Sequence, residues 1–135
     1  GAVILGTGSG TGGFLAPAIG TRTQATLTIQ SSLTFKSDAT YTCTFKATKN
    51  KAKSDEVIAD GVTIDSDATI VLGGQTRGAL KHGLTLTLIS NSSAGSISGT
   101  FANLADGAIV NVNGNNLQAN YAGGDGNDLT LTVVP

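Results

Sequence analysis

Hydrophobic and polar residues alternate along most of the chain, in short runs separated by turns rich in glycine, asparagine and aspartate. A period of two predicts half-buried β-strands, and no stretch shows the 3.6-residue period of an amphipathic helix. The pattern therefore predicts an all-β protein. The expected strands span residues 2–5, 25–29, 33–35, 41–45, 62–64, 70–72, 84–89, 108–112, 117–121 and 129–134.

A repeat indicates how these strands are arranged. LTFKSDATY at residues 33–41 is echoed by VTIDSDATI at residues 62–70, and the two Ser-Asp-Ala-Thr sequences begin 29 residues apart. Each copy is typical of a strand, a polar corner and a second strand, and repeats of roughly 20 to 50 residues indicate stacked units. We therefore predict a parallel β-helix (β-solenoid) of a few rungs. An antiparallel β-sandwich, whose strands have a similar spacing, is the alternative.

The composition agrees with a single folded unit. The 135 residues include 19 glycines, only 13% charged residues and 4% aromatic residues, which disfavours helices and suits strands and turns. A chain of this length can bury its own core. Residues 1–20 are expected to form a glycine-rich N-terminal strand and linker, and residues 21–135 a single β-solenoid domain.

Charge and residue usage exclude several function classes. The formal net charge is −1, so no overall field attracts nucleic acid or an anionic membrane, and no apolar run is long enough for membrane insertion. One cysteine and one histidine cannot form an intramolecular disulfide or a thiolate zinc cage. Cys43 alternates with Tyr41 and Phe45 and is predicted to be buried, while His82 is predicted to be an exposed turn residue. We expect no enzymatic activity and no cofactor.

Two motifs in the C-terminal third point to a family. GTFANLADGA at residues 99–108 and NYAGGDGNDLTLTVV at residues 120–134 resemble the closing segment of autotransporter-associated β-strand repeat proteins. The similarity lies mainly in residues 84–135, with a weaker match at Leu15-Ala16-Pro17 and at residues 54–57. The resemblance implies a right-handed parallel β-helix in a cell-surface passenger protein of a Gram-negative bacterium. The general rule for parallel crossovers favours the same handedness.

Six charged residues are candidates for carbohydrate chemistry. One polar loop gathers four lysines that suit an acidic polysaccharide or another polyanion, although a solvated loop has the same composition. Two aspartates are spaced like the paired carboxylates of polysaccharide-cleaving β-helices, although aspartates at corners more often cap turns. The lysines are Lys46, Lys49, Lys51 and Lys53, and the aspartates are Asp65 and Asp67.

Two glycine-rich segments resemble ligand-binding motifs. Residues 8–13 have the spacing of a dinucleotide fingerprint, but no helix is predicted after them, so a linker is expected. GGDGNDLTL at residues 123–131 resembles a calcium-binding nonapeptide, with Asp125, Asn127 and Asp128 as candidate ligands. The motif occurs once, and calcium needs oxygen ligands from a second turn, so a tight turn is the competing interpretation. No metal is assigned.

The ends of a short solenoid suggest self-association. An unpaired strand edge recruits another strand unless something covers it, and no cap is recognisable in the sequence. The first strand has the composition of a strand donated to a neighbour, although a linker from a longer chain fits it equally well. The residues expected to mediate self-association are Ala2, Val3, Ile4, Leu5, Leu129, Leu131 and Val133.

These features predict a non-enzymatic structural protein of the bacterial cell surface or extracellular space. The expected partners are further copies in an oligomer or an end-to-end filament, or neighbouring repeats of a longer chain. The alternatives are a carbohydrate-binding or polysaccharide-cleaving β-helix and an adhesin module, either of which makes a surface glycan the partner. Neither nucleic acid nor a membrane is expected as a partner.

Overall fold

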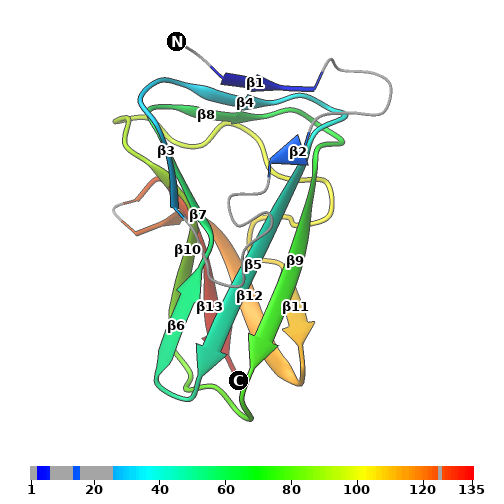
Figure 1. Cartoon of the computed structure of the whole chain (residues 1–135), viewed down its shortest axis with the longest axis vertical. Coiled ribbons are helices and arrows are strands. Elements are labelled where there is room, and N and C mark those ends of the chain that lie inside the picture. Colours follow the sequence, from blue (N-terminus) through cyan, green and yellow to red (C-terminus); the bar gives the residue numbers. More distant parts are fainter. Residues whose placement is uncertain (1–2, 7–13, 16–25, 125) are drawn as a thin grey trace.

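The computed structural model describes residues 3–6, 14–15, 26–124 and 126–135, and these residues form thirteen β-strands and no helix (Figure 1). The all-β prediction is confirmed. Within these ranges, nothing helical is long and apolar enough to cross a membrane. The strands are β1 (Val3–Leu5), β2 (Phe14–Leu15), β3 (Thr26–Ile29), β4 (Leu33–Phe35), β5 (Thr40–Thr48), β6 (Lys51–Ser54), β7 (Glu56–Ala59), β8 (Val62–Ile64), β9 (Thr69–Thr76), β10 (Thr85–Asn91), β11 (Ile109–Val112), β12 (Asn115–Gly123) and β13 (Asp128–Val134).

Nine strands form three parallel ladders. The first ladder joins β1, β4 and β8, the second β2, β5 and β9, and the third β3, β7 and β10. Leu33 pairs with Val62, and Thr40 pairs with Thr69 across the same 29-residue offset as the sequence repeat. The repeated Ser-Asp-Ala-Thr sequences form the corners between β4 and β5 and between β8 and β9. The interpretation of the repeat as strand, corner and strand is therefore confirmed.

The remaining pairs are antiparallel. β5 and β6 form a hairpin, β11 pairs with β12, and β13 lies between β12 and β10. The third ladder thus continues into a sheet of six strands with the order β11-β12-β13-β10-β7-β3. Because the sheets mix parallel and antiparallel pairs, the architecture is compatible with the β-sandwich alternative, and the described strands form no continuous solenoid sheet.

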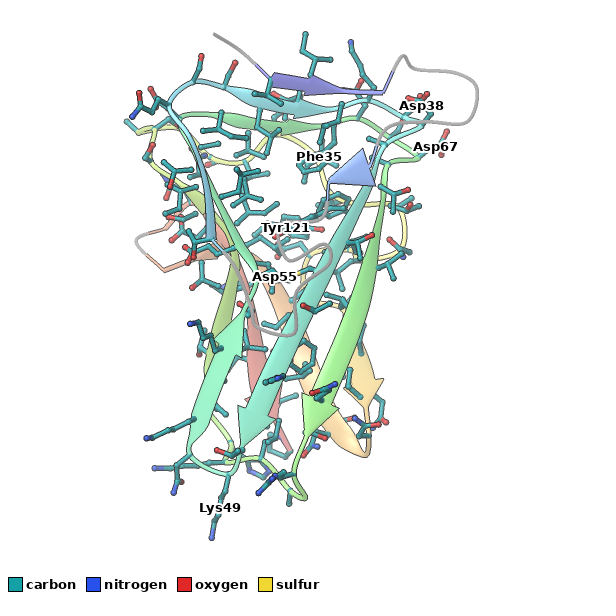
Figure 2. All side chains as sticks on the ribbon, viewed as in Figure 1. Phe35, Asp38, Lys49, Asp55, Asp67 and Tyr121 are labelled. Atoms are coloured by element: carbon teal, nitrogen blue, oxygen red, sulfur yellow. The ribbon has the colours of Figure 1, made fainter. Side chains whose placement is uncertain are left out.

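The hydrophobic core lies between the three sheets. The rings of Phe35, Tyr41 and Phe101 pack together with centroids 5.2 to 6.3 Å apart. Tyr41 lies on β5, and its hydroxyl donates a hydrogen bond of 2.9 Å to the carbonyl of Leu88 on β10, so two sheets are joined across the core. Figure 2 shows Phe35 beneath β1, β4 and β8, with many side chains filling the space below it.

The structure departs from the predicted elements around the lysines and near the N-terminus. The lysine-rich segment is a hairpin of β5 and β6 instead of a polar loop. Residues 3–5 and 14–15, expected in a strand and linker, pair with β4 and β5 of the same chain. The predicted boundary between residues 20 and 21 and the glycine motif at residues 8–13 lie outside the described residues.

Candidate functional site

A groove of about 900 Å³ opens at the end of the molecule formed by the β5–β6 hairpin and the end of β9. Figure 2 shows Lys49 projecting from this end, with further nitrogen-tipped side chains near it. We call this site the basic groove. Its lining combines cationic, amide, hydroxyl and small apolar groups, from Lys46, Ala47, Thr48, Asn50, Lys51, Ala52, Lys53, Gln75, Thr76, Arg77 and Leu84.

Strand register places the cations of the basic groove side by side. Lys46 pairs with Lys53 across the hairpin and with Gln75 across the parallel ladder. Paired residues project from the same face of a sheet. All three are exposed, whereas the neighbouring Phe45 and Ala47 are buried, so this is the outer face. Two lysines directly opposite each other repel and destabilise the sheet by about 0.2–1 kcal/mol.

Two further cations at this end of the molecule, Arg77 and Lys81, were not among the candidates predicted from the sequence. The Arg77 amide donates to the carbonyl of Ala47 at 3.1 Å, and the Lys81 amide donates to the carbonyl of Lys49 at 3.0 Å. The signal that places Arg77 was present in the sequence, because the 29-residue offset between β5 and β9 sets it opposite Thr48. Lys81 carried no comparable signal, since it lies in an irregular segment after β9.

Charge is distributed unevenly over the molecule. Six of the eight lysines and arginines lie at the basic groove or beside it, and none of these six forms an ion pair with another described residue. The segments that line and flank the groove, residues 45–54 and 75–86, contain no aspartate or glutamate. The net charge of −1 therefore conceals a strongly positive end, because all nine carboxylates belong to other segments.

The last strand of each parallel ladder, β8, β9 or β10, is bonded on its outer edge to a later part of the chain, and we call this arrangement the cap. On β8, the Ile64 amide donates to the carbonyl of Ser98 at 2.7 Å, and the Ser98 amide donates to the carbonyl of Val62 at 2.9 Å. On β9, the Asn103 side chain accepts from the Ile70 amide at 2.9 Å and donates to the Ile70 carbonyl at 2.6 Å. The third ladder ends where β13 pairs with β10. The last strand of each ladder thus has a hydrogen-bonding partner.

The residues of the two family-like motifs build this cap. The Tyr121 hydroxyl, from the second motif, accepts from the Phe101 amide at 3.1 Å and donates to the carbonyl of Leu104 at 2.6 Å, both in the first motif. Burial raises the pKa of Tyr121 to about 12, so its hydroxyl keeps the proton that it donates. The Asp106 carboxylate accepts from the Tyr121 amide at 3.0 Å. The motif residues therefore have a structural explanation.

The N-terminal end of the ladders differs from the capped end. Within the described part of the chain, no residue pairs with the outer edge of β1, β2 or β3. The Val3 amide donates to the carbonyl of Ser32, and the Leu5 carbonyl accepts from Lys36. Bonds to one neighbour alternate along a parallel strand, so the amide and carbonyl of Ile4 face away from β4. The Ile4 side chain is 59% exposed. We call the unpaired outer edges of β1, β2 and β3 the open edge.

The predicted self-association residues lie in two different places, the open edge and the core. Val3, Ile4 and Leu5 form β1 at the open edge, while Ala2 lies outside the described residues. The other three lie on β13, which is paired along both edges with strands of the same chain, and their side chains belong to the core. They are Leu129, Leu131 and Val133.

Two of the three candidate calcium ligands can be placed in the structure. Asp125 lies outside the described residues. The Asp128 carboxylate accepts from the Asn91 amide at 2.9 Å. The Asn127 side-chain amide donates to the carbonyls of Ser93 and Gly95, and its oxygen has no hydrogen-bond partner among the described residues. The described residues contain no group of three or more histidine, cysteine, aspartate or glutamate side chains placed to hold a metal ion.

The two corner aspartates also have structural roles. The Asp65 carboxylate lies 4.0 Å from the Lys36 ammonium, and the Asp65 amide donates to the carbonyl of Phe35. Asp67 occupies the corner with a φ of 75°, a left-handed conformation that aspartate tolerates better than most residues. Figure 2 shows Asp67 near Asp38, which belongs to the preceding copy of the repeat. Asp65 and Asp67 thus belong to the corner between β8 and β9.

Three further titratable residues can be placed. Cys43 is buried, and burial raises the pKa of its thiol to about 12, so it is protonated at neutral pH. Partial burial, together with the nearby Asp128 carboxylate, raises the pKa of Glu56. His82 is exposed in the turn that precedes β10.

Comparisons with protein-family models, curated proteins and solved structures found no match to the chain.

Proposed function

We propose that the chain is a non-enzymatic structural module of a bacterial cell-surface or secreted protein, built as a short right-handed parallel β-helix. The observation that carries the proposal is the set of three parallel ladders, in two of which the pairing of β4 with β8 and of β5 with β9 follows the 29-residue repeat. Stacked units with this spacing extend a protein in one direction and present a long outer surface. The resemblance to autotransporter-associated β-strand repeat proteins supports the surface location.

The cap supports a terminal position for this module in a stack. Backbone groups at the end of a stack recruit further strands unless they are satisfied, and here Ser98 bonds to β8, Asn103 bonds to Ile70 of β9, and β13 pairs with β10. A module with one open edge and one capped end adds a strand on one side only. We therefore propose association of two copies through their open edges, in place of the filament expected from the sequence.

The assembly test uses light scattering and electron microscopy of the full chain over a concentration series. Ile4→Pro removes the outward amide, while the fixed φ of proline is compatible with an edge strand. Ile4→Thr keeps the amide and is the matched control. We expect dimers of the unmodified chain and of Ile4→Thr, and monomers of Ile4→Pro.

Four outcomes would contradict the proposal. A monomer at every concentration, or equal dimerisation of Ile4→Pro, would show that the open edge is not an association site. Filaments of the unmodified chain would show that the capped end also adds strands. Cleavage of an acidic polysaccharide by the purified chain would exclude a purely structural role and favour the polysaccharide-cleaving alternative.

A further inference from the structure

We infer that the basic groove binds a linear acidic polysaccharide, a sugar chain bearing carboxylate or sulfate groups. This inference does not depend on the association of two copies, because the groove is formed by one chain. It rests on the register that brings the cations together, on the absence of compensating carboxylates among the described residues, and on the polar groups beside the cations.

The charge of the groove is available to a ligand. Lys46 and Lys53 lie directly opposite each other, and Lys51 follows on the same face because its partner is Thr48. No described carboxylate forms an ion pair with these lysines. A structural role would favour alternating signs across the hairpin, since opposite charges stabilise a cross-strand pair and like charges destabilise it. An anionic ligand relieves this repulsion, so the arrangement suits binding better than folding.

The uncharged lining indicates sugar hydroxyl groups. Thr48, Asn50, Gln75 and Thr76 contribute hydroxyl and amide groups that donate and accept hydrogen bonds. Thr48 follows Lys46 on the outer face of β5, and Gln75, on the outer face of β9, precedes Arg77, so uncharged polar groups alternate with cations there. A polymer that carries both hydroxyls and anionic groups matches this alternation, whereas a small inorganic anion uses only the charge.

Nucleic acid fits the groove less well. Proteins that bind single strands stack bases on exposed aromatic side chains. Every aromatic side chain that the structure describes is buried, and none lines the groove. An anionic lipid surface also fits less well, because the exposed large hydrophobic residues Ile4, Leu27, Val71 and Ile109 do not line the groove.

Binding of the full chain to polygalacturonate at low ionic strength tests the inference, with dextran as the neutral control polymer. Each exposed cation contributes about three-fold to affinity, so Lys46→Gln, Lys53→Gln and Arg77→Gln together weaken binding about 30-fold. Lys53→Gln alone weakens it about three-fold. Lys36→Gln removes the same charge outside the groove and leaves affinity within about two-fold, which excludes an effect of net charge. Gln75→Lys adds a cation to the groove and strengthens binding.

Several results would overturn the inference. They are absence of binding to polygalacturonate at low salt, equal losses for Lys36→Gln and Lys53→Gln, and equal binding to dextran. Tighter binding to single-stranded DNA or to vesicles of anionic phospholipid would assign the groove to one of those partners instead. Far-ultraviolet circular dichroism of each variant confirms that it remains folded. Loss of binding with the oligomeric state unchanged separates this inference from the assembly proposal.

Discussion

Asn103 is the residue whose replacement tests the cap most directly. Its side chain forms two hydrogen bonds with the backbone of Ile70 on the outer edge of β9, at 2.9 and 2.6 Å. Each such bond contributes about 0.5–1.5 kcal/mol, so Asn103→Ala lowers the free energy of unfolding by about 2 kcal/mol. For a chain of this length, that loss lowers Tm by roughly 6–10 °C.

Two matched variants separate the contributions of the two hydrogen bonds from the effect of a nearby substitution. Asn103→Asp still accepts from the Ile70 amide but has no group to donate to the Ile70 carbonyl, so about half of the stability loss is expected. Ala102→Ser changes the exposed neighbouring side chain and leaves the bond between the Ala102 amide and the Ala68 carbonyl in place. Its Tm stays close to that of the unmodified chain. Thermal and urea unfolding, followed by circular dichroism, give the three values.

The same variant tests the link between the cap and assembly. Asn103→Ala leaves the outward amide and carbonyl of Ile70 on β9 without their side-chain partner, so β9 can add a strand in addition to the open edge, and we expect electron microscopy to show filaments that the unmodified chain does not form. Adding Ile4→Pro closes the opposite end and limits assembly again. An Asn103→Ala variant with unchanged Tm and unchanged oligomeric state would refute the reasoning, because the two bonds would then neither stabilise the fold nor protect the edge.

Three further predictions concern other parts of the molecule. Gly99 has a φ of 85°, and a Cβ there would overlap the carbonyl oxygen of a neighbouring strand, so Gly99→Ala lowers the free energy of unfolding by about 3 kcal/mol or more. Gly107 has a φ of 82° but open space around it, so Gly107→Ala lowers the free energy of unfolding by only about 1–2 kcal/mol. Chemical denaturation measures both values. Partial burial penalises the ionised form of Glu56 and so raises its pKa, and the native state therefore loses stability as pH rises through the carboxyl pKa. Glu56→Gln raises Tm at pH 7, and this advantage disappears well below pH 4. A Tm gain that persists in acid would contradict that assignment. Lys53→Thr removes the repulsion with Lys46 and raises stability by about 0.2–1 kcal/mol while weakening polygalacturonate binding; a loss of stability would indicate that the lysine supports the hairpin.

Local sequence determined the strands and the repeat. Alternation of polar and apolar residues located Leu33–Phe35 and Val62–Ile64 with the bounds that the structure has, because each residue of a half-buried strand faces either core or solvent. The repeated Ser-Asp-Ala-Thr corners gave the offset between β5 and β9. The segments Lys51–Ser54 and Glu56–Ala59 escaped prediction because the first has no large apolar residue and the second has three apolar residues in succession instead of alternation.

Only the tertiary structure decided which edges are covered and which charges lie together. The cap depends on the Asn103 side chain reaching Ile70, 33 residues earlier in the chain, and no local pattern encodes a contact over that distance. The basic groove likewise needed the register of β5 with β6 and β9 to bring Arg77 beside the lysine hairpin. Sequence fixes side-chain chemistry and local periodicity, whereas long-range pairing decides which of those side chains meet.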